Sequence, residues 1–311
     1  MALAYNGDIT VGTLVVSFTF VNMMVWPIRD VATILSNMAR AIAAMDRLLI
    51  ILNEPVEDIV SGDKPKINGE IIFENVTFQF DDAKDPVLHD VNLKIKKGAT
   101  VAVLGKTGAG KSTLAYLLTR LYDPTKGRIL IDGQDITEIS RSHLRQNVAT
   151  VLQEPFLFSK TIISNIRIAN PNASEEEVYK AARIADIHDN ILTFKQGYET
   201  PVGEKGVTLS GGQRQRLAIA RTIINKAPIL IFDDSLSAVD TETDINIRTA
   251  LKKRSEETTT LIITHRIATA KDADLIIVLE NGTISEQGTH EQLIARKGLY
   301  QRVYEIQTKL Q

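Results

Sequence analysis

Residues 105–112 read Gly-Lys-Thr-Gly-Ala-Gly-Lys-Ser, and they lie between a short apolar run, 101–104, and a segment of helical character, 112–122. This is the pattern G-x-x-x-x-G-K-S in the strand-to-helix context that the pattern requires. Glycines allow consecutive backbone N–H groups to turn toward phosphate oxygens, and the positive end of the following helix strengthens that site. Lys111 can reach the terminal phosphates, and the Ser112 hydroxyl can bind magnesium. We therefore predict that this loop binds a nucleotide.

The predicted ligands of this loop are a nucleotide and Mg²⁺, and the resemblance described below implies that the nucleotide is ATP. The loop residues expected to contact them are Gly105, Thr107, Gly108, Ala109, Gly110, Lys111, Ser112 and Thr113. A second apolar run, 229–232, ends in Asp233 and Asp234. A strand that ends in two carboxylates delivers them to one edge of a sheet, so we assign Asp233, together with Ser112, to the metal. Asp234 is expected nearer the attacking water, as a general base.

Strands that alternate with helices indicate the fold class. Four apolar runs are too short for helices and are typical of strands buried on both faces: 101–104, 229–232, 261–263 and 275–279. Helical segments lie between them, including one that begins at Ser174 with Glu177 three residues later, which is the spacing of a capping box. We predict an α/β domain with a mainly parallel sheet.

An additional strand is predicted near the start of this domain. Four apolar residues share one parity there: Ile72, Val76, Phe78 and Phe80. Because successive side chains of a strand point to opposite faces, these four are expected to face a common side.

The first fifty residues have a different character. Residues 9–28 carry no charge, and about 20 apolar residues suffice for a helix to cross a bilayer. Asp8 precedes this run, and the arginines that follow it are Arg29, Arg40 and Arg47. That asymmetry places the C-terminal side in the cytoplasm if the run spans a membrane. Apolar residues recur at helical spacing through 31–52, so the helix is expected to continue beyond the membrane. A buried helix of a soluble protein is the alternative.

These segments divide the chain into three predicted parts: a membrane helix with its cytoplasmic extension (1–53), a linker (54–69) and an α/β domain (70–311). The 311 residues include 36 basic and 38 acidic side chains, for a net charge of −2, and no cysteine. Such a balance offers no electrostatic basis for binding nucleic acid. Without cysteine, a disulfide scaffold, a thiol nucleophile and a Cys-ligated zinc site are excluded.

A second glycine-containing helix start lies at residues 209–213, Leu-Ser-Gly-Gly-Gln. It would form another anion-binding helix terminus, and the string resembles the signature of ATP-binding-cassette (ABC) proteins. The other matching positions are the Q-loop glutamine (Gln153, after a strand at 148–152), the D-loop (237–240), the switch histidine (His265) and the exporter X-loop (203–206).

The resemblance covers the whole chain and is to exporters of this family. It implies a P-loop (RecA-like) sheet with an antiparallel β subdomain and a helical subdomain. It also implies that two such domains pair head to tail, so that each nucleotide lies against the signature of the partner. Gln153 and His265 would act in hydrolysis with Asp234, and Gln153 would also contact the metal. The further nucleotide contacts implied are Ser210, Gly211, Gly212, Gln213, Asp240 and, against the adenine, Phe80, for which core packing is the alternative role.

The family further implies an ATP-hydrolysing exporter subunit in the plasma membrane, with its nucleotide-binding domain in the cytoplasm. The exported small molecule or lipid is not specified by these residues. A half-exporter carries six membrane helices, whereas this chain has room for one, so a fragment, a truncated gene and a split transporter all remain open.

Asp234 is the other departure, because the family usually has glutamate at this position. One methylene less draws the carboxylate back by roughly an ångström, and a misplacement of ~1 Å can lower a rate by about 100-fold. We therefore expect weak hydrolysis at this site and favour a heterodimer whose partner supplies glutamate. The alternatives are a non-hydrolytic, nucleotide-gated regulatory module and a soluble P-loop ATPase.

Overall fold

The computed structural model describes residues 10–237, 239–253 and 258–309, and the chain divides into two units, Met1–Glu57 and Asp58–Gln311. The described part of the first unit is dominated by helix α2, Val11–Asn53, which begins after its N-cap Thr10. As predicted, one helix continues through both the uncharged run and the amphipathic segment, with Pro27 inside it. Ile9, the first residue of the predicted membrane run, and Asp8, which precedes that run, lie outside the described residues.

Polar side chains in the uncharged part of α2 bond back to the helix itself. Ser17 Oγ donates to the carbonyl of Thr13 at 2.8 Å, and Asn22 Nδ2 donates to the carbonyl of Phe18 at 3.1 Å. Within a bilayer core every polar group needs a partner in the protein, and these groups find theirs one turn earlier. The residues that dilute the hydrophobicity of this segment are therefore compatible with a lipid environment.

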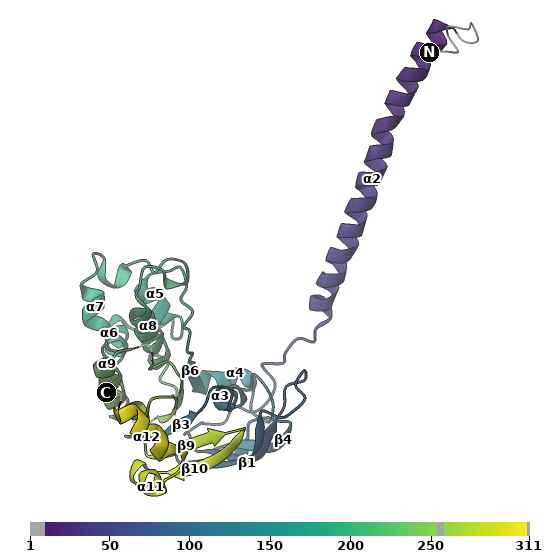
Figure 1. The fold of residues 1–311 in the computed structure, drawn as a ribbon. Helices are drawn as coiled ribbons and strands as arrows, with labels where there is room; N and C mark the ends of the chain where they lie inside the picture. The colour runs from purple at the N-terminus through teal and green to yellow at the C-terminus, as the bar shows by residue number, and fades with distance from the viewer. Residues whose placement is uncertain (1–9, 238, 254–257, 310–311) are drawn as a thin grey trace. The chain divides into compact units, whose positions relative to one another are not determined.

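The second unit is built around a six-stranded sheet (Figure 1). Its strands, in spatial order, are β10 (Thr283–Gly288), β9 (Leu275–Glu280), β3 (Thr100–Gly105), β8 (Thr259–Ile263), β7 (Ile229–Asp233) and β6 (Val148–Val151). All neighbouring pairs are parallel except β10 with β9. The mainly parallel sheet predicted from the sequence is confirmed.

A separate four-stranded sheet forms the antiparallel β subdomain. Its order is β2 (Leu88–Ile95), β1 (Ile71–Phe78), β4 (Lys126–Ile131) and β5 (Gln134–Asp135). Both neighbours of β1 run antiparallel to it. This sheet matches the one implied by the resemblance to the family.

The predicted parity of β1 is wrong at one position. Ile71 and Phe73 are buried together with Val76 and Phe78, whereas Ile72 is only partly buried. The pairing register shifts between Phe73 and Val76, where Asn75 adopts φ 51°. A β-bulge inserts one extra residue and thereby exchanges the two faces of a strand. Ile72 therefore belongs to the face opposite to that of Val76 and Phe78.

Helices cover the central sheet and form a further lobe. Their bounds are α3 Lys111–Leu118, α4 Arg141–Asn147, α5 Ile162–Arg167, α6 Glu175–Ile184, α7 His188–Leu192, α8 Gly211–Ile223, α9 Thr241–Lys252, α10 Ile267–Ala270, α11 His290–Ala295 and α12 Leu299–Lys309, with short 3₁₀ turns at Gly197–Glu199 and Glu204–Gly206. The capping box predicted at Ser174 and Glu177 is present at the start of α6. Helices α5 and α6 pack on α8 and form the helical subdomain (Figure 1).

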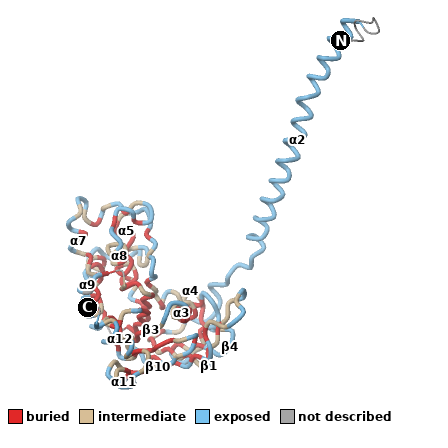
Figure 2. Tube along the Cα trace, in the orientation of Figure 1, coloured by how far each residue is buried: buried red, intermediate tan, exposed pale blue. Residues whose placement is uncertain are grey.

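Strand β3 shows how the core is divided. Val101 and Val103 are buried with the antiparallel sheet and α3, whereas Ala102 and Leu104 are buried with α10, α11 and α12 on the opposite face. The strand is therefore covered on both sides, as its continuous apolar run predicts. Figure 2 shows the resulting buried segments in the interior of this unit, with exposed loops around them.

Candidate phosphate and magnesium site

Parallel strands bring the predicted site residues to one edge of the sheet. Strands β3, β8, β7 and β6 run parallel to their neighbours, so their carboxyl ends meet at the same edge. The predicted nucleotide loop follows β3, and Asp233 is the last residue of β7. Ligands of open α/β sheets bind outside the carboxyl ends of the strands. The topology thus brings together residues that are distant in the chain, such as Ser112 and Asp233, which lie 121 positions apart.

The loop between β3 and α3 has the backbone that an anion site requires. Gly108 adopts φ 83°, and an added Cβ there would have no atom within 4 Å. Gly110 is the N-cap of α3 with φ 94°, and a Cβ there would lie 2.7 Å from Leu88 Cδ2. Any other residue would therefore be strained at Gly110. The end of β3, this loop and the first turn of α3 together contain the predicted contacts Gly105, Thr107, Gly108, Ala109, Gly110, Lys111, Ser112 and Thr113.

Helix α3 begins without a side-chain cap. Gly110 has no side chain to cap the first turn, whose N–H groups have no partner within the helix. Most other helices of this unit do carry a side-chain cap, as Ser174 does for α6. A phosphate group supplies the acceptor oxygens that this helix start lacks. The local geometry therefore fits the phosphates of a nucleotide.

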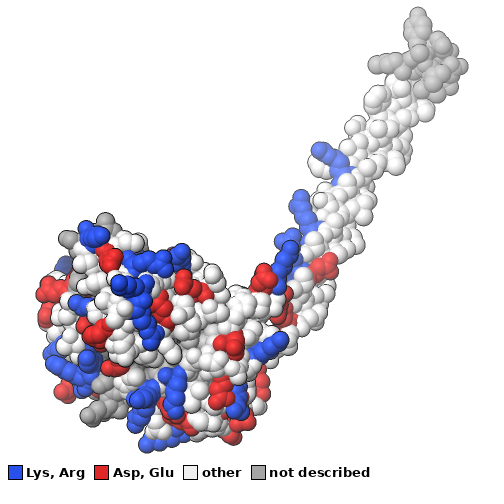
Figure 3. All heavy atoms as spheres, turned by 60° about the horizontal axis from the view of Figure 1, so that its bottom comes forward, with Lys and Arg blue, Asp and Glu red and all other residues white. Residues whose placement is uncertain are grey.

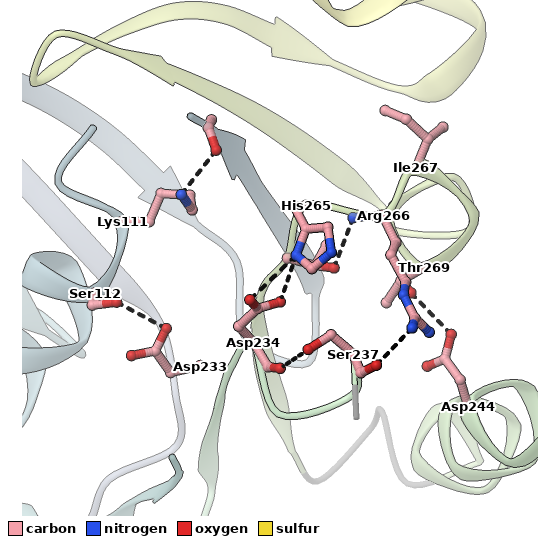
Figure 4. A network of polar contacts seen from close by, with 12 residues as sticks. Lys111, Ser112, Asp233, Asp234, Ser237, Asp244, His265, Arg266, Ile267 and Thr269 are labelled. Atoms are coloured by element: carbon pink, nitrogen blue, oxygen red, sulfur yellow. Dashed lines mark hydrogen bonds and ion pairs between the residues drawn. The ribbon is translucent and has the colours of Figure 1, made fainter. Parts of the chain in front are cut away.

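Lys111 lies over its own loop. Its Nζ donates to the carbonyls of Gly105 at 2.8 Å and Lys106 at 2.9 Å, and Figure 4 draws one of these two bonds. Burial lowers the pKa of Lys111, and the carboxylates of Asp234 and Asp233 oppose that shift. A partly desolvated ammonium interacts strongly with phosphate oxygens, because fewer water molecules compete for it.

Ser112 and Asp233 are in direct contact. The Ser112 hydroxyl donates to Asp233 Oδ1 at 3.0 Å, and the Asp233 side chain is buried. Burial raises the pKa of Asp233, with Asp234 adding to the shift and the Ser112 hydrogen bond and Lys111 opposing it. Among the residues that the structure describes, no group of three or more His, Cys, Asp or Glu could hold a metal. Mg²⁺ usually takes only one or two protein oxygens beside phosphates and water, so Ser112 and Asp233 fit it.

Asp234 and His265 form the second contact at this edge (Figure 4). His265 Nδ1 lies 3.0 Å from Asp234 Oδ1 and 3.2 Å from Oδ2. Asp234 has left-handed backbone, φ 47°, and its N–H donates to the carbonyl of Ile263 at 2.9 Å. That turn directs the carboxylate away from the sheet and toward His265. The sequence predicted roles for both residues but not their contact.

The signature residues lie apart from this loop. Ser210 caps α8: its hydroxyl accepts from Gln213 N at 3.3 Å, while Gln213 Oε1 accepts from Ser210 N at 2.9 Å. Ser210 and Gly211 are exposed, and Gly212 is partly exposed. Among the described residues, no hydrogen bond joins 210–213 to 105–113.

The other predicted contacts have different surroundings. Asp240 caps α9, where hydrogen bonding from Thr243 lowers the pKa of its carboxyl. Gln153 is exposed and lies two residues beyond β6, because this strand ends at Val151 rather than at the expected residue 152. Phe80 packs edge-on against Phe78 at 4.8 Å and Tyr122 at 5.1 Å between ring centroids.

Two residues near the site were missed by sequence reasoning. Arg266 donates to the carbonyl of Ser237 at 2.6 Å and to that of Val239 at 3.3 Å, which joins the segment after β8 to the predicted D-loop. The buried Gln215 of α8 donates to the carbonyl of Leu152 at 3.1 Å, just before Gln153. No sequence signal points to either, because backbone carbonyls distant in the chain are their partners.

Comparison with known proteins agrees with this geometry. Residues 88–237 match the family model described as "ABC transporter". The chain carries an ABC transporter domain. The matched range of this ABC domain includes the loop before α3, the signature, Asp233 and Asp234, and the segment that contains Gln153.

The relatives that match this chain are described as exporters in their names. This chain is 44% identical over 308 residues to the multidrug export ATP-binding/permease protein YgaD of Bacillus subtilis (strain 168). It is also 44% identical over 308 residues to SAOUHSC_02003 of Staphylococcus aureus (strain NCTC 8325 / PS 47), which has the same description. The alignments cover 97% and 98% of the chain but 53% of each relative, so the chain spans about half the length of the curated relatives it matches.

A solved structure of a bacterial Atm1-family ABC exporter with ATP bound has the same fold as this chain. The TM-score is 0.81 at 38% sequence identity, over 96% of this chain and 52% of that one. This similarity extends over both units of the chain, and it confirms the fold class expected from the resemblance.

Proposed function

We propose that this chain is the ATP-binding and ATP-hydrolysing part of a membrane exporter. The observation that carries the proposal is the convergence of Lys111, Ser112, Asp233, Asp234 and His265 at the carboxyl edge of one parallel sheet. Its test is Mg²⁺-dependent phosphate release from ATP by the purified chain. The names of the relatives support export of a small molecule, and a lipid is the second substrate class that we consider.

Different residues of the chain would bind the phosphates, hold Mg²⁺ and accept the proton of the attacking water. The N–H groups at the start of α3 and the Lys111 ammonium bind the phosphates, while Ser112 and Asp233 would hold Mg²⁺. When bound, that ion neutralises charge on the phosphate oxygens. The Asp234 carboxylate accepts a proton from the attacking water, and His265, in the tautomer with a proton on Nδ1, donates to Asp234 and orients it.

We further propose that turnover at this site is slow because the base is aspartate. A shorter side chain retracts the carboxylate, and its contact with His265 then limits its reach toward the water. A regulatory module that binds ATP without turnover is the second candidate. Steady-state phosphate release above the level of an Asp234→Asn variant would exclude that candidate.

The position of the signature supports a head-to-tail dimer. Ser210 and Gly211 are exposed and do not bond to the chain's own phosphate loop. Because Ser210 Oγ accepts from Gln213 N, its proton remains free to donate to a phosphate oxygen. We propose that this hydroxyl binds the nucleotide held by a partner chain. We also propose that the slow hydrolysis expected from Asp234 favours a partner with glutamate at the equivalent position.

A mixing experiment tests whether the site is shared between two chains. We expect Ser210→Ala and Lys111→Ala each to lower turnover by about 100-fold, because each removes a donor to the reacting phosphates. Mixed in equal amounts, the two variants should recover turnover above that of either alone. A mixed pair contains one site with an intact Lys111 loop and an intact partner signature. Phosphate release by the mixture, compared with each variant, measures this.

Ser174→Ala is the matched control, because it removes the same type of capping box from α6, in the same subdomain. Loss of an N-cap lowers stability by about 1 kcal/mol in either helix. If Ser174→Ala lowers turnover as much as Ser210→Ala does, helix stability rather than phosphate binding explains the loss. If the mixture shows no recovery, the shared site is contradicted.

Helix α2 supports a membrane location for the first unit. In the described residues it is the one helix long and apolar enough to cross a membrane, with a mean hydropathy of 1.7 over the best window. At the end of the uncharged segment, the guanidinium carbon of Arg29 lies 5.9 Å from the centroid of the Trp26 ring. Aromatic and basic residues in this position anchor a helix to the membrane interface. The part of α2 that precedes Arg29 carries no charged side chain, and in Figure 3 this end of the helix has no blue or red atoms. We propose that residues 9–28 span the plasma membrane, that the rest of α2 extends into the cytoplasm, and that residues 54–69 link it to a cytoplasmic domain, 70–311.

Cysteine labelling tests this topology in a chain that contains no native cysteine. Asn6→Cys should react with a membrane-impermeant maleimide in intact cells, whereas Asn53→Cys at the other end of α2 should react only after lysis. The reason is that the basic residues all follow the uncharged run. Labelling of Asn6→Cys only after lysis would reverse the orientation. Extraction of the chain without detergent would instead favour a soluble P-loop ATPase.

A further inference from the structure

Gln307 of α12 bonds to the backbone on both sides of Arg266. Its Nε2 donates to the carbonyl of His265 at 2.7 Å, and its Oε1 accepts from Ile267 N at 2.8 Å. The amide nitrogen and the amide oxygen of one side chain therefore both bond to the segment 265–267. The bonded residues lie 42 and 40 positions earlier in the chain.

The local sequence does not supply these partners. Strand β8 ends at Ile263, so the carbonyl of His265 lies beyond the sheet. Helix α10 starts at Ile267, and its N-cap Arg266 makes no side-chain capping bond. The first N–H groups of a helix have no intrahelical partner. Gln307 thus supplies the cap that α10 lacks and, with its other end, the donor that the His265 carbonyl needs.

Ile267 of this segment is buried, but the packing beside His265 leaves a space. This space is a mostly apolar cavity, and its walls include His265, Ile267 and three residues of α12. Leu299, Tyr300 and Val303 come from α12, so the helix covers the segment without filling the space next to it. The two hydrogen bonds of Gln307 add directional contacts at the backbone of His265, which nonpolar packing does not supply because the hydrophobic effect is non-directional.

The same segment contains His265, whose contact with Asp234 is expected to be needed for ATP hydrolysis. His265 lies 3.0 Å from Asp234 on one side, and Arg266 bonds to the carbonyls of Ser237 and Val239 on the other (Figure 4). A change in the backbone at His265 would move the imidazole relative to the carboxylate. Gln307 is the described residue of α12 that touches this backbone through hydrogen bonds.

We propose that Gln307 is a positioning residue: it holds the backbone of His265 so that the imidazole meets Asp234, and α12 thereby controls ATP turnover. The inference rests on the proposed function, because it assigns His265 a part in hydrolysis. Gln307 itself does not touch the nucleotide loop through any hydrogen bond of the described residues.

The test uses the full chain in detergent or nanodiscs, with Gln307→Met as the variant. Methionine has similar length and good helix propensity but cannot form the two bonds. Gln301→Met is the matched control, since Gln301 lies on the same helix and bonds to Glu305 of α12. Two readouts are recorded: the imidazole ¹³C–¹H signals of the five histidines, with His265 assigned by its loss in His265→Gln, and the kinetics of phosphate release.

We expect Gln307→Met to shift the His265 signal and to lower kcat by about tenfold, less than the ~100-fold of a full ångström displacement. The KM for ATP should change less than about twofold, because the phosphate contacts remain in place. Gln301→Met should change neither quantity. An unshifted His265 signal, or an equal shift in both variants, overturns the proposal, and so does a shifted signal with unchanged kcat.

Gln307→Glu separates positioning of His265 from simple capping of α10. A carboxylate can still accept from Ile267 N but cannot donate to the His265 carbonyl. We expect this variant to resemble Gln307→Met in both readouts, and full recovery by glutamate would overturn the positioning role. If the wild-type chain releases no phosphate at all, the proposed hydrolysis fails, while the His265 signal still decides whether Gln307 positions the ring.

Discussion

Lys111→Ala is expected to weaken ATP binding by about 10- to 100-fold. A hydrogen bond to a charged group contributes about 1.5–3 kcal/mol, and every 1.4 kcal/mol is a factor of ten in affinity. The ammonium lies above the loop between β3 and α3, partly desolvated, and no other lysine or arginine among the described residues bonds to that loop. Equilibrium titration with a fluorescent ATP analogue, in the presence of Mg²⁺, measures the change.

Lys106→Ala is the matched control for this prediction. Lys106 belongs to the same loop and carries the same charge, but it is exposed, and its contact with Lys111 is through the backbone carbonyl. Its replacement should change ATP affinity less than about threefold, which is the scale of a solvent-exposed charge. Equal losses in the two variants would mean that net charge, rather than the position of the Lys111 ammonium, determines binding.

Asp234→Glu is expected to raise ATP turnover by about 10- to 100-fold. The added methylene advances the carboxylate by roughly an ångström, and a misplacement of that size accounts for about 100-fold in rate. The His265 side chain, 59% exposed, can follow a longer partner because little packing confines it. ATP affinity should stay within about twofold of the original value, since the groups that hold the phosphates are unchanged. Phosphate release at saturating ATP gives the comparison.

Asp234→Asn fixes the baseline for this measurement, because an amide cannot act as the base. If the wild-type chain alone hydrolyses ATP briskly and Asp234→Glu changes nothing, aspartate is an adequate base. The case for a partner that supplies glutamate would then disappear, while the shared site tested by mixing variants would be unaffected. If Asp234→Asn turns over as fast as the wild-type chain, the residue is not the base at all.

The sequence by itself determined the local features of this protein. The glycine-rich loop, the apolar strands and the capping box at Ser174 are signals read within a few residues, because turn geometry, burial on both faces and capping depend on neighbours in the chain. The uncharged run likewise determined one long helix, since length and helical periodicity suffice for that prediction. The family signature followed from short strings of the same kind.

Only the tertiary structure decided which distant groups meet. The bulge at Asn75 reversed the parity of Ile72, and it depends on pairing with two neighbouring strands. The contact of His265 with Asp234 and the hold of Gln307 on the His265 backbone join residues 31 and 42 positions apart. Sequence periodicity carries no information on such pairs, because a side-chain amide or a carboxylate finds its partner only after packing has fixed the intervening backbone. Parallel strands bring their ends together, and helix packing then selects the contacts.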